Sequence, residues 1–267
     1  MKPGRNRPIG VFDSGIGGLT VVKSLRKLMP GESIIYFGDT ARVPYGNKSA
    51  ETVKCFSREI MDFMLEKNVK MIVVACNTAS SLALSALKRE YTLPVTGVIA
   101  PGVKEAVRIT KNGRIGVIGT DSTISSRAYD KELKRRDRKC RLFSRGCPLF
   151  VPLVENRFFS DPVTYDVAGR YLSELKKRHI DTLILGCTHY PLLKNAIGDI
   201  MKKVNLVDSA SSVAKMVKQE MDKRNIGADR KKRNASVKCF VSDDAEGFRR
   251  TARIFLREKI SVKKVAL

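Results

Sequence analysis

Short apolar runs alternate with segments of helical hydrophobic spacing along most of the chain. Alternation of this kind predicts a parallel sheet with helices on both of its faces. The last apolar run of the first part is followed by Ala100, Pro101 and Gly102, which we expect to end it. The expected strands of this part are residues 9–12, 33–37, 71–75 and 95–98, and the expected helices are residues 19–28, 50–67 and 80–91.

The pattern then starts again. Residues 114–120 resemble residues 8–14, because in both an apolar strand runs into a polar turn and a helix. Later elements are expected at 206–208, 211–224, 238–241 and 245–256, with the final ones returning to the first half. We therefore predict an α/β fold of two similar parallel-sheet domains, related by a pseudo-twofold axis, with the active site between them. The first domain is expected to comprise residues 1–98 with 210–267, and the second residues 99–209.

Composition indicates a globular protein. The chain has 267 residues, of which 43% are hydrophobic, enough for one large or two modest domains. No apolar run approaches the roughly 18 residues of a membrane span. The basic residues 1–8 lead into a short strand and not into a secretory apolar stretch, so we expect a cytoplasmic protein without a membrane partner.

The formal net charge of +24 is the unusual bulk feature. Such a charge suggests nucleic-acid binding, and the densest basic stretches are residues 131–141 and 223–233. Neither stretch interleaves aromatic residues, as single-strand binders often do. A solvated basic surface is the favoured interpretation, and nucleic-acid binding remains the alternative.

Two of the six cysteines occupy matching places in the two halves. Cys76 and Cys187 each follow a short apolar strand and lead into a polar turn. Open α/β sheets bind their ligands at the carboxyl ends of the strands. Two thiols placed there by similar halves would face one small substrate from opposite sides. In that arrangement, one thiol could remove a proton from one face of a carbon while the other returns a proton to the opposite face.

The residues after each cysteine offer hydrogen bonds to the carboxylate or ammonium group of an amino acid. Asn77 and Thr78 follow the first cysteine, and Thr188 and His189 follow the second. Because each cysteine is expected to precede a helix, we expect its thiolate to be favoured. His189 is close enough in sequence to tune or protonate Cys187, whereas His179, the other histidine, is interpreted as structural.

Three other interpretations of the cysteine pair stay open on the residues alone. Cys76, Cys187 and His189, with Asp13, would supply four zinc ligands, although the C-x-H spacing is not a usual zinc pattern. A redox pair is possible in principle, but C-x-x-C spacing is absent. Both cysteines could also be packing residues, as we interpret Cys239.

A glycine-rich turn follows the first strand. Its sequence, residues 13–18, invites a dinucleotide-binding interpretation, but Thr20 stands where the third glycine of that motif belongs. Asp13 at the strand end would also repel a pyrophosphate. The turn is better interpreted as one that presents Asp13 and Ser14 beside helix N–H groups. A second loop, residues 38–46, lies at the same edge, where Pro44 and Gly46 shape a turn that could aim N–H groups at a carboxylate.

Taken together, these motifs resemble the glutamate racemases, of the cofactor-independent aspartate/glutamate racemase family. The resemblance extends over nearly the whole chain, and the two cysteine motifs are specific in combination. It is carried by residues 12–18, 38–46, 75–80, 152–155, 186–193, 207–209 and 242–244, with Phe248.

The resemblance implies racemisation of glutamate without cofactor or metal, by a homodimeric enzyme that supplies D-glutamate for peptidoglycan. It implies that Cys76 and Cys187 take turns as base and acid, that Asp13 and His189 assist the adjacent thiols, and that Glu155 supports the second side. Aspartate or another amino acid remains the alternative substrate. The implied substrate contacts are Asp13, Ser14, Tyr45, Gly46, Asn77, Thr78, Thr188 and His189.

Overall fold

The computed structural model describes residues 4–228, 235–256 and 260–267. Within these residues, ten strands form two sheets, and every strand pair is parallel. The first sheet has the order β10-β9-β2-β1-β3-β4 and the second β6-β5-β7-β8. Their bounds are β1 Ile9–Asp13, β2 Ile34–Gly38, β3 Met71–Val74, β4 Val95–Gly97, β5 Arg114–Gly119, β6 Arg141–Gly146, β7 Thr182–Gly186, β8 Asn205–Asp208, β9 Val237–Val241 and β10 Ser261–Lys264.

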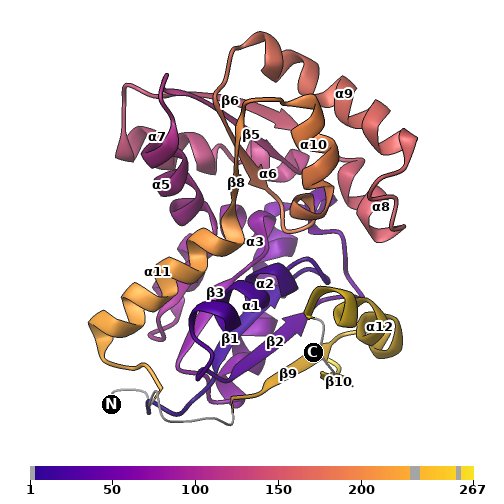
Figure 1. Ribbon diagram of the computed structural model, residues 1–267. Helices are drawn as coiled ribbons and strands as arrows, with labels where there is room; N and C mark the ends of the chain where they lie inside the picture. The colour runs from indigo at the N-terminus through magenta and orange to yellow at the C-terminus, as the bar shows by residue number, and fades with distance from the viewer. Residues whose placement is uncertain (1–3, 229–234, 257–259) are drawn as a thin grey trace.

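The two sheets repeat one topology. The order β2-β1-β3-β4 in the first sheet matches β6-β5-β7-β8 in the second, with β1 equivalent to β5 and β3 equivalent to β7. Figure 1 shows the two sheets in separate parts of the molecule, with α3 (Asn77–Leu82) near their junction. The predicted fold class, two parallel α/β halves, is confirmed.

Helices cover both faces of each sheet because successive strand residues point to opposite sides. In β1, Val11 packs in a core with α1 and α11, whereas Phe12 packs on the other face against α2. Ile184 and Leu185 of β7 divide in the same way between two further cores. The helices are α1 Leu19–Leu28, α2 Ala50–Glu66, α3 Asn77–Leu82, α4 Leu84–Glu90, α5 Ile99–Ile109, α6 Asp121–Ser125, α7 Ala128–Arg136, α8 Phe150–Glu155, α9 Pro162–Lys177, α10 Lys194–Ile200, α11 Ser209–Arg224 and α12 Ala245–Leu256, with short 3₁₀ turns at Tyr45–Asn47 and Tyr190–Leu193.

Two expected elements differ from those observed. The single helix expected at 80–91 is two helices, and the first of them begins at Asn77 because the Cys76 sulfur caps it by accepting the N–H of Ala79. Residues 100–102 follow β4 as expected, but they lie inside α5. Pro101 is tolerated there because the first turn of a helix needs no N–H from it.

The tail rejoins the first sheet, as the sequence suggested. Strand β9 pairs with β2, and β10 pairs with β9, so the segment after α11 extends the first sheet at its β2 side. Helix α11 packs against both α1 and α5 and so contacts helices from both halves. The exact division into residues 1–98 with 210–267 and residues 99–209 stays a prediction.

The basic stretches fall in different settings. Residues 131–141 form the end of α7 and the turn into the edge strand β6, where Arg135 and Arg136 both pair with Glu132. Of the stretch 223–233, residues 229–233 lie outside the described residues. In the part of the chain that the structure describes, no helix is long and apolar enough to cross a membrane.

A buried ion pair anchors the start of the first sheet. Lys70, which precedes β3, has no exposed side-chain surface, and its Nζ lies 2.5 Å from Oε2 of Glu32. The same ammonium donates to the carbonyl of Arg5 at 2.9 Å, while Oε1 of Glu32 accepts the N–H of Ala228. The pair therefore joins segments that lie far apart in the sequence.

We expect Lys70→Ala to lower the free energy of unfolding by about 3 kcal/mol, because the substitution leaves a buried carboxylate without its cation. Urea denaturation measures the loss. The matched control is Lys218→Ala, which breaks the exposed pair with Asp222 (39% and 62% exposed side chains) and should cost less than about 0.5 kcal/mol. Equal losses in the two variants would contradict this account.

Candidate active site

The two cysteines meet at one small cavity between the halves. Cys76 follows β3 and Cys187 follows β7, at equivalent places in the two sheets. The cavity is only about 20 Å³, room for roughly one water molecule. It is lined by Ser14, Val43, Pro44, Tyr45, Gly46, Cys76, Asn77, Thr78, Thr120, Val151, Cys187, Thr188 and His189.

Cys76 is buried and surrounded by groups that keep it protonated. Its thiol donates to Oγ of Ser14 at 3.7 Å, and its sulfur accepts the N–H of Ala79 at 3.5 Å. Burial and the nearby Asp13 carboxylate outweigh these hydrogen bonds and raise the pKa of Cys76 to about 12. The expectation that the helix start favours its thiolate is therefore wrong.

Cys187 lies beside a histidine and a glutamate. Its sulfur is 3.8 Å from Nδ1 of His189, and Nε2 of that ring is 2.5 Å from Oε1 of Glu155 on α8. Burial opposes protonation of the imidazole, but Cys187 and Glu155 outweigh it and raise the pKa of His189 well above its ordinary value. Burial raises the pKa of Glu155, but the bond from His189 reverses the effect and leaves it below its usual range. A 3₁₀ turn, and not an α-helix, follows this cysteine, which corrects the expected helix start.

Asp13 lies beneath the cavity and not in its wall. Its carboxylate has no exposed surface and accepts the N–H groups of Gly15 (3.2 Å) and Gly18 (3.0 Å) through Oδ2. Its Oδ1 accepts the hydroxyl of Thr188 at 3.3 Å, so it connects the first glycine turn with the second cysteine motif. Burial raises the pKa of Asp13, partly offset by the charge of His189 and by these hydrogen bonds.

The loop after β2 forms one wall of the cavity. Tyr45 and Gly46 line it, but the Tyr45 hydroxyl donates to Asp39, a carboxylate that is itself fully buried. A side chain at Gly46 would come within 2.7 Å of Thr120 from the second half, so only glycine fits this contact. The Tyr45 hydroxyl thus ties the loop to Asp39, at the wall of the cavity.

Several residues of the site carried no recognisable sequence signal. The hydroxyls of Thr78, Thr120 and Thr123 lie within 2.9–3.2 Å of one another, which joins the first cysteine motif to the start of α6. Tyr129 on α7 donates to Oδ1 of Asn77 at 2.7 Å. Thr78 was a predicted site residue, whereas the polar turn after β5 was the only indication in the sequence for Thr120 and Thr123.

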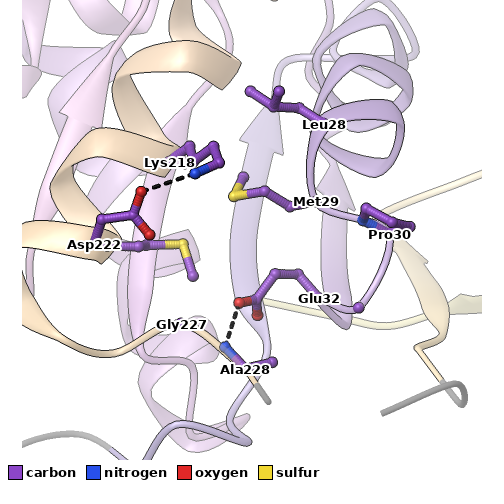
Figure 2. Close-up of a pocket in the computed structure, with 10 residues that line it drawn as sticks. Leu28, Met29, Pro30, Glu32, Lys218, Asp222, Gly227 and Ala228 are labelled. Carbon is purple, nitrogen blue, oxygen red and sulfur yellow. Dashed lines mark hydrogen bonds and ion pairs between the residues drawn. The ribbon is translucent and has the colours of Figure 1, made fainter. Parts of the chain in front are cut away.

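Larger hollows occur elsewhere, and one of them adjoins the site, since it shares Val43 with the cysteine cavity and is lined by Glu155. Another, in Figure 2, of about 350 Å³, lies between the end of α1 and helix α11. Leu28 and Met29 form part of its wall, and the exposed Lys218–Asp222 pair lies across from them. No cysteine or histidine is among the residues that line it, so chemistry and not size identifies the site. Among the described residues, no group of three or more His, Cys, Asp or Glu side chains is placed to hold a metal ion.

Comparison with known proteins identifies the family of this chain. The sequence model of the family described as Asp/Glu/Hydantoin racemase matches residues 16–217. A glutamate racemase of Geobacter metallireducens is 48% identical over 255 residues, covering 95% of this chain and 94% of that protein. The crystal structure of a glutamate racemase isoform from Bacillus anthracis has a TM-score of 0.95 at 40% identity, with 98% of each chain covered. The glutamate racemase of Francisella tularensis, solved with D-glutamate, has a TM-score of 0.91 at 38% identity and 98% coverage of each chain.

The fold and the paired sites thus define a racemase, an enzyme of the isomerase class. The chain belongs to the Asp/Glu/Hydantoin racemase family, and within it to the glutamate racemases.

The charge state of His189 gives a direct test of the site's electrostatics. We expect its imidazole to stay protonated well above pH 6.5, and Glu155→Gln to lower its pKa, because the carboxylate that favours the cation is gone. Histidine NMR signals followed against pH measure this. The chain has two histidines, and only His189 contacts Glu155, so the signal that Glu155→Gln changes is assigned to His189.

The Glu155→Gln substitution should also change how the stability of the fold depends on pH. A raised folded pKa means that protonated His189 stabilises the fold fully below about pH 6.5, and that this contribution is lost as pH rises through the folded pKa. Glu155→Gln should therefore lower stability most at mildly acidic pH and least at alkaline pH. Thermal unfolding at several pH values measures the difference, and a loss independent of pH would contradict the assignment.

Proposed function

We propose that this protein interconverts L- and D-glutamate by two-base proton transfer between Cys76 and Cys187, and so supplies D-glutamate for peptidoglycan synthesis in the cytoplasm. The observation that carries the proposal is the pair of thiols, one from each half, at the wall of one cavity. Inversion needs an acid and a base on opposite faces of the α-carbon, since a single base would mostly return the proton to the face it left.

The surroundings of the two sulfurs support unlike starting states. Cys76, with its pKa raised by burial and by Asp13, is the protonated partner and the proton donor. Cys187 has the His189 imidazole beside it, a cation that suits a thiolate acting as base. After one turnover the proton has moved from one sulfur to the other, and the reverse reaction uses the swapped states.

Polar groups around the thiols suit an amino acid whose α-carbon loses a proton. Removal of that proton spreads negative charge onto the α-carboxylate, and fixed donors stabilise such charge best when they are already oriented. Ser14 and Thr78 offer such donors from the first half, and Thr188 and His189 offer them from the second, while Asn77 lines the same cavity. The D-glutamate bound by the Francisella tularensis relative supports glutamate as the substrate over a shorter acid.

We expect Cys76→Ser and Cys187→Ser each to lower racemisation by at least about 10³-fold, since a serine hydroxyl is a far weaker acid and base than a thiol. The assay follows the optical rotation of L-glutamate and the exchange of its α-proton in D₂O, without added cofactor. Cys55→Ser, at an exposed cysteine away from the cavity, is the control and should keep wild-type rates. A wild-type protein without exchange or racemisation would overturn the function, and an active variant at either site would overturn the two-thiol mechanism.

The homodimer remains a prediction of the family resemblance. Light scattering of the purified protein tests it independently of catalysis.

A further inference from the structure

One buried amide in the cavity wall is only half satisfied. Asn77 is 3% exposed, and its Oδ1 accepts the hydroxyl of Tyr129 at 2.7 Å. Its Nδ2 has no hydrogen-bond partner among the residues that the structure describes. A buried donor without a partner destabilises a folded protein, so an unpaired one at a cavity wall calls for a functional explanation.

Tyr129 touches both cysteine motifs. It lies on α7 of the second half, is 2% exposed, and donates across to the residue that follows Cys76. Its ring also packs on Gly186, the residue before Cys187, where an added Cβ would come within 3.2 Å of the phenol oxygen. The phenol therefore lies where the two strand ends approach each other.

The direction of this hydrogen bond determines which end of the amide remains free. Burial raises the pKa of Tyr129, so the phenol stays protonated at neutral pH. Its hydroxyl donates a hydrogen bond to Oδ1 of Asn77. The nitrogen is then the atom left for a ligand, and it is a donor. In the opposite orientation an oxygen would be left, and a carboxylate would face another acceptor.

We propose that Tyr129 is a positioning residue, which holds the Asn77 amide with its nitrogen free to donate to a carboxylate of the amino-acid substrate. The inference rests on the proposed function, since it assigns the group that orients one substrate contact. Tyr129 does not line the cavity itself, and the hydrogen bond that it donates to Asn77 is its link to the cavity wall, besides its interaction with Ser209.

Tyr129→Phe tests the proposal, because it keeps the ring on Gly186 and removes only the hydroxyl. A carboxylate is charged in both the ground state and the transition state, so loss of the oriented donor should raise KM for glutamate about 10-fold and change kcat less than about threefold. In an Asn77→Ala background the same substitution should have no further effect on KM, since the group it orients is gone. If turnover of Asn77→Ala is too slow to give a KM, titration calorimetry measures the Kd of D-glutamate for the same set of variants.

Tyr190→Phe is the matched control. Tyr190 is also fully buried and donates one hydrogen bond, to the carbonyl of Cys147 at 2.9 Å. It should lose thermal stability comparable to that lost by Tyr129→Phe but keep the wild-type KM. A KM for Tyr129→Phe within about twofold of wild type, or a full effect that persists without Asn77, would overturn the positioning role. Either result, obtained with an active wild-type enzyme, would leave the proposed racemase function intact.

Discussion

The carboxylate of Asp13 is the point on which both halves of the site depend. It has no contact with solvent, and its two oxygens hold the first glycine turn and the hydroxyl of Thr188. The turn can come this close to the second cysteine motif only because residue 17 is glycine, where a Cβ would lie 2.4 Å from Oγ1 of Thr188. Gly17, which has no side chain, and the buried carboxylate of Asp13 together allow the second half of the molecule to pack against the first.

The backbone is duplicated, but the electrostatics are not. Equivalent strands present the two sulfurs, yet Cys76 has a carboxylate and a serine near it, whereas Cys187 has an imidazole that is itself paired with Glu155. This difference is what the proposed chemistry needs, because two identical environments would not define which sulfur carries the proton at the start. The repeated topology presents the two sulfurs at equivalent strand ends, and unlike neighbours surround them.

Much of this arrangement could be predicted from local sequence. Apolar runs predicted the strands that carry the cysteines, and the restart near residue 114 predicted the second half. The edge strand β6 gave little signal, because Arg141 and Arg145 interrupt its apolar pattern. The contacts of Tyr129 with Asn77 and of Thr120 with Thr78 were not predictable, since each joins residues more than forty positions apart. The pKa of Cys76 also depends on burial and on Asp13, neither of which its own motif reveals.

The size of the cavity has a consequence for how the enzyme turns over. A space for about one water molecule is far too small for glutamate, so the walls around the two sulfurs must separate before the substrate binds. One wall is the loop at Tyr45 and Gly46, and the facing one includes Val151 and the second cysteine motif. Under the proposed mechanism, each catalytic cycle would contain an opening and a closing step besides the two proton transfers, and such steps limit the rate of many enzymes. In that mechanism, closure would also keep bulk water from the sulfurs, so that the proton returned to the α-carbon comes from a thiol and not from solvent.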